Sequence, residues 1–139
     1  MNELLKEVEQ MRSQIVEWRR HFHQNAELSF EEFKTSDFIE EKLRSFGGIE
    51  IERPTKTGVI GKIYGKGKGP TVAVRADIDA LPMTEVNDIP FVSVNKQAMH
   101  SCGHDGHAAM LLGIAKMFSE RKEKMNGNLI CIFQHAEEL

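Results

Sequence analysis

Hydrophobic residues recur at steps of three and four along the first part of the chain, a spacing that predicts two amphipathic helices. Residues 3–23 carry Leu4, Val8, Met11, Ile15, Trp18 and Phe22 at this spacing, and residues 33–46 carry Phe33, Phe38, Ile39, Leu43 and Phe46. Ser29, followed three positions later by Glu32, predicts a capping box for the second helix. Gly47 and Gly48 predict its end, because glycine readily adopts the left-handed conformation found at helix C-termini.

After residue 48 the hydrophobic period changes to two, which is typical of strands. Three strands are expected at 49–52, 58–65 and 71–78, with a hairpin turn over 65–70. A helical pattern returns from Asp105, and the apolar run "LICIF" predicts a last, buried strand. The resulting order, ααβββαβ, predicts a layered α/β fold.

Acidic residues follow two of the predicted strands. Asp77 and Asp79 come at the end of "TVAVRA", and Glu137 and Glu138 follow "LICIFQHA". Ligands bind at the carboxyl ends of strands in open α/β sheets, so this edge is where a functional site is expected.

Composition narrows the class of protein. The chain has 139 residues, enough for one domain with a core, and its net charge of −3 gives no reason to expect a nucleic acid or an acidic membrane surface as partner. Apolar runs fall short of the ~20 residues that a membrane-spanning helix needs. Two cysteines do not make a disulfide framework, and we expect a cytoplasmic protein.

The stretch "MHSCGHDGH" concentrates groups that bind metals. His100, Cys102 and His104 alternate, so in an extended segment all three face one side, and thiolate and imidazole suit zinc. A polar turn before a helix explains the same residues about equally well. The acidic pairs favour the metal site. In extended backbone, Glu137 and Glu138 point apart, which would let one bind a metal while the other handles a proton.

A cysteine nucleophile is the chemical alternative. Cys102 precedes a predicted helix, and a helix N-terminus favours the reactive thiolate. Nucleophilic catalysis has no obvious use for four converging carboxylates, whereas a two-metal hydrolase does. The pattern therefore favours the metal site.

Four segments together resemble a known family. "RRHFHQNAELSFEE", "VRADIDALPMTE", "MHSCGHDGHAAMLLGIAKM" and "FQHAEE" are similar, in order and spacing, to metal-dependent amidohydrolases of the aminoacylase, hippurate hydrolase and auxin-conjugate hydrolase type. The resemblance covers almost the whole chain. Two positions depart from the family pattern: Ala26 and His135 each stand where proline is common.

The resemblance implies an α/β catalytic domain of zinc-peptidase type that carries two divalent metal ions and hydrolyses the amide bond of N-acyl amino acids. Carried over by position, Cys102, His104 and Glu138 are metal ligands, and Glu137 is the general base that takes a proton from the attacking water. Cysteine ligation favours zinc and leaves manganese, cobalt and nickel open.

The same resemblance implies that Asp77 and Asp79 orient the ligand side chains and do not bind the metal directly. It also implies that residues 1–139 are the N-terminal part of a di-metal catalytic domain, without the lid or dimerisation domain and the C-terminal part. The partner is then a small N-acyl amino acid, and the full-length protein is expected to form a homo-oligomer. The alternative is that the 139-residue chain is itself a non-catalytic fragment that binds metal weakly.

Overall fold

A computed structural model describes residues 3–139. Its elements follow in the order α1 (Glu3–Gln24), α2 (Phe33–Phe46), β1 (Glu50–Glu52), β2 (Val59–Tyr64), β3 (Gly67–Asp77), α3 (His104–Arg121), the short 3₁₀ turn η1 (Lys122–Lys124) and β4 (Asn126–Gln134). This order confirms the layered α/β fold expected from the hydrophobic pattern.

The four strands form one mixed sheet in the order β1-β2-β4-β3. β2 pairs with β1 and with β4 in antiparallel fashion, whereas β3 and β4 run parallel. The hairpin expected over residues 65–70 is therefore wrong. β3 already begins at Gly67 and pairs with β4, because α3 carries the chain back so that β4 enters between β2 and β3.

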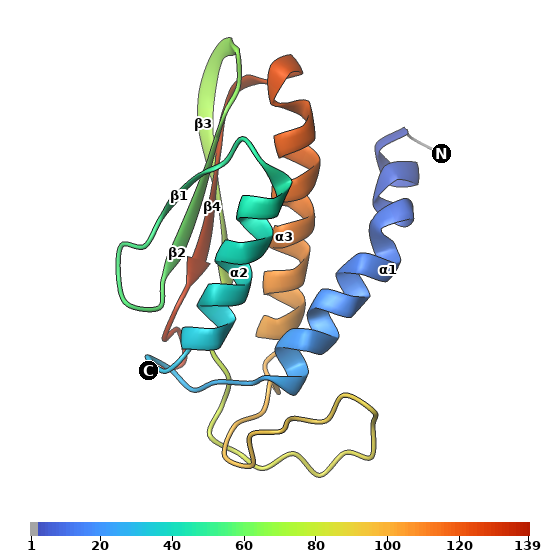
Figure 1. Ribbon diagram of the computed structural model, residues 1–139, viewed down its shortest axis with the longest axis vertical. Coiled ribbons are helices and arrows are strands. Elements are labelled where there is room, and N and C mark those ends of the chain that lie inside the picture. Colours follow the sequence, from blue (N-terminus) through green and yellow to red (C-terminus); the bar gives the residue numbers. More distant parts are fainter. Residues whose placement is uncertain (1–2) are drawn as a thin grey trace.

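This βαβ arrangement positions the site. The parallel strands β3 and β4 end at the same edge of the sheet, and α3 begins at that edge. Figure 1 shows the loop after β3, the start of α3 and the C-terminus gathered at the lower end of the molecule, close to the start of α2. Side chains far apart in sequence are thereby brought together.

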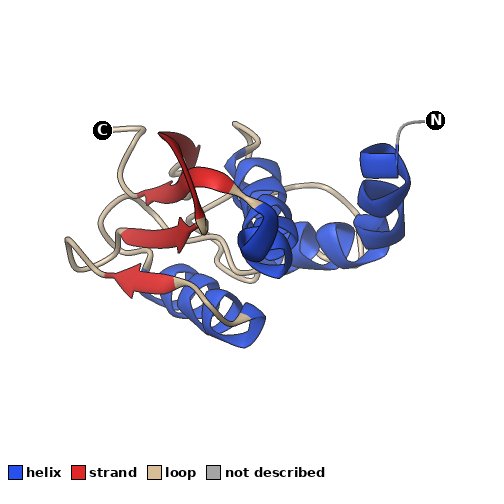
Figure 2. Ribbon diagram, turned by 90° about the horizontal axis from the view of Figure 1, so that it is seen from above, coloured by secondary structure: helices blue, strands red, loops and turns tan. Residues whose placement is uncertain are grey.

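α2 and α3 pack against one face of the sheet and against each other, and α1 packs against α3 (Figure 2). In β4, Leu129, Cys131 and Phe133 are buried in the core, whereas the alternating Ile130 and Ile132 are only half-buried. The run "LICIF" therefore behaves as a strand covered by helices on one face, with a less covered opposite face.

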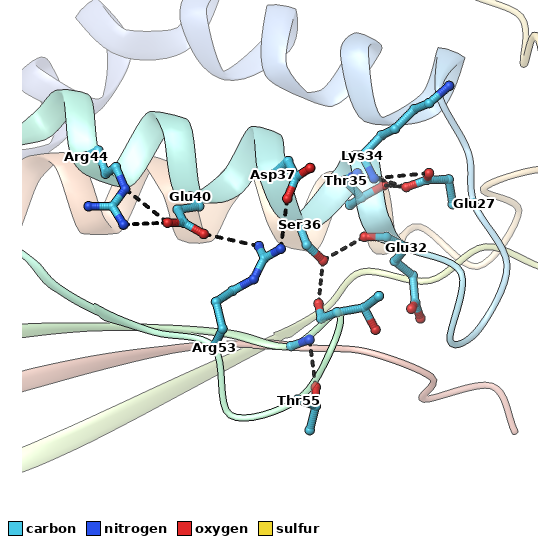
Figure 3. A network of polar contacts seen from close by, with 12 residues as sticks. Glu27, Glu32, Lys34, Thr35, Ser36, Asp37, Glu40, Arg44, Arg53 and Thr55 are labelled. Carbon is cyan, nitrogen blue, oxygen red and sulfur yellow. Dashed lines mark hydrogen bonds and ion pairs between the residues drawn. The ribbon is translucent and has the colours of Figure 1, made fainter.

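The ends of α2 differ in how well the sequence predicted them. Gly47 and Gly48 do take positive φ values of 75° and 67° after its last turn. The capping box is wrong, because Glu32 makes no side-chain cap and the Ser29 hydroxyl donates to Asp79. The Glu27 carboxylate instead accepts hydrogen bonds from the first turn of α2, as Figure 3 shows.

Among residues 3–139, every helix is too short or too polar to cross a membrane.

Candidate metal centre

His104 is the centre of the site. It is the first residue of α3 and is 3% exposed. Its Nδ1 lies 3.0 Å from the backbone oxygen of Asp79 and 3.2 Å from Asp79 Oδ1. Because a carbonyl oxygen only accepts hydrogen bonds, Nδ1 carries the proton and donates. This leaves Nε2 as the nitrogen that faces the site, an arrangement typical of metal-binding histidines.

Three carboxylates surround His104 Nε2. Their nearest oxygens lie 3.7 Å away for Glu137, 3.8 Å for Glu138 and 4.0 Å for Asp77. The expectation that Glu137 and Glu138 point apart is therefore wrong. The chain turns at these residues instead of continuing as a strand, so both side chains reach the same imidazole.

The structure brings Cys102 to the same point. Its Sγ, a ring nitrogen of His104 and a carboxylate oxygen of Glu138 all lie within 4.8 Å of one another. His100 does not join this group, contrary to the expectation that the alternating residues share a face. It is buried near His23, with ring centroids 6.5 Å apart, because residues 100–103 bend toward α3 instead of forming a strand.

Asp79 holds the site from behind. Besides contacting His104, its Oδ2 accepts hydrogen bonds from the Ser29 hydroxyl at 2.8 Å and from the Glu138 N–H at 2.9 Å. Burial acts to raise the pKa of Asp79, but the hydrogen bonds from Glu138 and Ser29 favour the charged form, and the pKa lies below its ordinary value. Asp79 therefore stays ionised and fixes both His104 and the backbone of Glu138.

Asp77 occupies the other side of the site. Arg75 Nε lies 3.2 Å from its Oδ1, and its remaining oxygen faces His104. Asp77, His104 and His107 also offer ligand atoms within 4.8 Å of one another. Nδ1 of His104 is engaged with Asp79, so both candidate groups would have to use the single lone pair of His104 Nε2. An ion bound to Nε2 in one group therefore leaves no donor atom of His104 for the other group.

The local charge is strongly negative. A hydrogen bond to Glu138, followed by desolvation and by the charges of Glu138, Glu137 and Asp79, raises the pKa of the Cys102 thiol. One oxygen of Glu138, Oε1, is buried without a hydrogen-bond donor among the described residues. Such a set of sulfur, nitrogen and oxygen donors fits a divalent cation, which would neutralise the carboxylates and stabilise the thiolate.

Some contributors were not foreseen from the sequence. Ser29 was expected to cap a helix, and His107 had no expected role. The i,i+3 spacing of His104 and His107 on a helix was the available signal for His107. His135, the departure from the family pattern, lies with its ring against Phe30, at a centroid distance of 5.5 Å, and is in neither candidate metal group.

The chain is similar to known proteins over most of its length. Residues 73–139 match peptidase family M20/M25/M40. The chain is 50% identical to an N-acyl-L-amino acid amidohydrolase from Geobacillus stearothermophilus, with 99% of this chain and 37% of that protein aligned. It is 45% identical to thermostable carboxypeptidase 2 from Saccharolobus solfataricus, with 99% of this chain and 35% of that protein aligned.

A solved structure shows the same fold. The chain superposes on a dinuclear metal-binding peptidase of the M20 family from Bacillus subtilis with a TM-score of 0.88 and 42% identity, over 94% of this chain and 36% of that one. The chain thus spans about a third of the length of the relatives it matches. The matched segment contains the whole cluster around His104, and this chain belongs to the M20 family of metal-dependent amidohydrolases and peptidases.

Proposed function

We propose that the whole protein hydrolyses the amide bond of N-acyl amino acids at a metal centre to which this chain contributes Cys102, His104 and Glu138. The observation that carries the proposal is the convergence of these three donors within 4.8 Å, beside a second glutamate, Glu137. The 50% identity to an N-acyl-L-amino acid amidohydrolase supports the substrate class.

The chain's own residues divide the work. When bound, a divalent ion would supply Lewis acidity, which makes water a better nucleophile and polarises the amide carbonyl. His104 is oriented by Asp79 to present Nε2, and Cys102 and Glu138 complete the donor set. Glu137 is the more exposed glutamate, with 37% of its side chain exposed, so it can reach a water molecule and a substrate. It takes the proton of the attacking water and delivers it to the departing amine.

The alternative of a cysteine nucleophile is less well supported. That mechanism needs a lowered thiol pKa, whereas the carboxylates around Cys102 raise it. A cation bound among these carboxylates would neutralise their charge and lower the pKa of the Cys102 thiol, so the same surroundings suit a thiolate that binds a metal. The donor set therefore favours metal binding over nucleophilic attack.

The whole protein should be tested with N-acetyl and N-benzoyl amino acids and with a dipeptide, before and after removal of metal by a chelator. We expect hydrolysis that is lost with the chelator and restored by Zn²⁺, Mn²⁺ or Co²⁺. Faster cleavage of the dipeptide would favour the carboxypeptidase activity named for the Saccharolobus relative. Activity that survives complete metal removal would contradict the proposal and favour Cys102 as nucleophile.

The isolated 139-residue chain is proposed to bind metal weakly and to have little or no turnover, since three protein donors supply a minimal set for a single ion. Purified chain should be assayed with the same substrates, and its metal content measured by elemental analysis. Robust hydrolysis by this chain alone would contradict that proposal.

A further inference from the structure

Glu32 is a buried acid that the proposed mechanism does not use. It is the residue just before α2, is 0% exposed, and makes no cap to its own helix. One oxygen, Oε1, accepts a hydrogen bond of 2.8 Å from the N–H of Ala136, and Oε2 is without a hydrogen-bond donor among the described residues. Burying a carboxylate with so few partners is unfavourable, so fold stability does not explain an acid at this position.

The partner of Glu32 has an unusual backbone. Ala136 has a φ of 50°, in the left-handed region that residues other than glycine rarely adopt. It immediately precedes Glu137 and Glu138, and the turn that begins there directs both carboxylates toward His104. A conformation of this kind persists only when its surroundings hold it in place.

Two carboxylates from other parts of the chain hold the two ends of this turn. Glu32 accepts the N–H of Ala136, and Asp79 accepts the N–H of Glu138 at 2.9 Å. The two glutamates of the site therefore lie in a segment fixed at both ends. Asp79 was recognised from the family pattern, whereas Glu32 was not.

Glu32 is itself firmly anchored. Its backbone oxygen accepts hydrogen bonds from the N–H and the hydroxyl of Ser36, and the same hydroxyl contacts the backbone oxygen of Thr57. Figure 3 shows this anchoring at the start of α2, with the Glu32 carboxylate extending away from the helix.

We propose that Glu32 is a positioning residue for the metal centre: by holding the N–H of Ala136, it fixes the turn that brings Glu137 and Glu138 to His104. This inference rests on the proposed function, because Glu32 acts only by positioning the proposed metal ligand Glu138 and the proposed general base Glu137. It does not require Glu32 to touch metal or substrate.

The test compares Glu32→Ala and Glu32→Gln with the wild-type chain, using Co²⁺ alone as the probe. The near-ultraviolet charge-transfer band from the Cys102 thiolate to cobalt reports both binding and site geometry. Glu32→Ala, which removes the acceptor, is expected to weaken Co²⁺ affinity about tenfold. Glu32→Gln keeps a carbonyl acceptor and is expected to recover most of that loss.

Glu27→Ala is the matched control. Glu27 accepts hydrogen bonds from the first turn of the same helix but does not contact the turn at residues 136–138. It should lower stability without changing the Co²⁺ affinity or spectrum. If Glu32→Ala binds Co²⁺ as tightly as Glu27→Ala and with the same band, the proposal is overturned.

A second measurement is independent of metal and of any variant's ability to fold. In the wild-type chain, the Ala136 amide proton should be protected from hydrogen exchange although it lies outside regular structure. Exchange at the rate of an unstructured peptide would overturn the role of Glu32. A wild-type chain with a protected Ala136 amide but no cobalt band would instead count against the metal centre of the proposed function.

Discussion

At the scale of single residues, the distances from Glu137 and Glu138 to His104 do not show which glutamate is the metal ligand and which is the general base. Their oxygens lie 3.7 and 3.8 Å from His104 Nε2. Their surroundings do differ. The N–H of Glu138 donates to Asp79, and a carboxylate oxygen of Glu138 lies within 4.8 Å of Cys102 Sγ. The side chain of Glu138 is 20% exposed, whereas that of Glu137 is 37% exposed. The more enclosed residue suits a ligand, and the more open one suits a base.

Glu137→Gln and Glu138→Gln should therefore fail in different ways in the whole protein. Glu137→Gln keeps the shape of the side chain but cannot accept a proton, so we expect near-normal metal content and a rate lower by roughly 10²–10⁴-fold. Glu138→Gln replaces a charged donor with a neutral one, so metal content and rate should fall together. Elemental analysis beside the rate separates the two, and the opposite pattern would exchange the two roles.

Glu85 provides a pH prediction outside the metal centre. Burial acts to raise its pKa, but hydrogen bonds from His23, the Ser93 N–H and Asn87 lower it from the ordinary 4.5 to about 2. Because the folded-state pKa is the lower one, Glu85 stabilises the fold above pH 4.5, and this contribution is lost as pH falls from about 4.5 to about 2.

Glu85→Gln should lower the free energy of unfolding at neutral pH by roughly 1–3 kcal/mol. The difference from the wild-type chain should shrink across that acid window, because protonated Glu85 no longer favours the fold. Urea unfolding at several pH values measures this. A difference that stays constant between about pH 5 and pH 2 would contradict the assignment.

The sequence predicted which side chains form the site better than it predicted where those side chains point. Cys102, His104, Asp77, Asp79 and both glutamates were named from their types and spacing, and the structure brings them together. The turn at Glu137 was not predictable, because alternation rules assume extended backbone and Ala136 gives no sign of a positive φ. Glu32 was misjudged because its burial depends on a loop about a hundred residues away.

At the scale of elements, helices and strands were predictable from periodicity, but their pairing was not. Local patterns place β2 and β3 next to each other in sequence, and a short Gly-rich link suggests a hairpin. The actual order places β4 between them, which depends on α3 carrying the chain back to the sheet. That crossover is what brings the acidic ends of β3 and β4 to one edge.

The start of α3 gives a prediction at this scale. Gly103 has a φ of 91° and lies between Cys102 and His104. A Cβ there would meet no atom within 4 Å, so the cost of Gly103→Ala is conformational and is expected to be about 1–2 kcal/mol of stability.

Gly106→Ala is the control for that substitution. Gly106 lies in the first turn of the same helix, and a Cβ there also meets nothing within 4 Å. Since alanine favours helix, this variant should be neutral or more stable by up to about 1 kcal/mol. Thermal or urea unfolding compares the two. Equal effects of both substitutions would mean that the left-handed conformation of Gly103 is not required.

At the scale of the whole molecule, the proposed metal ligands come from separate parts of the fold. Cys102 lies in the long loop after β3, His104 begins α3, and Glu138 follows β4. An ion that binds all three ties these parts together in the folded state, and the unfolded chain offers no such arrangement. Metal binding should therefore stabilise the whole fold by mass action.

Zn²⁺ at about 100 times its dissociation constant is expected to add about 2.7 kcal/mol of stability. For a chain of this size, that corresponds to a rise in Tm of about 10 °C. Cys102→Ser should remove most of this rise, while Glu123→Gln, which changes an exposed carboxylate far from the site, should leave it intact. Thermal unfolding of the three proteins with Zn²⁺ and with a chelator measures the effect. A Tm that rises equally in the Cys102→Ser variant would show that Zn²⁺ binds elsewhere, and the metal centre around His104 would have to be abandoned.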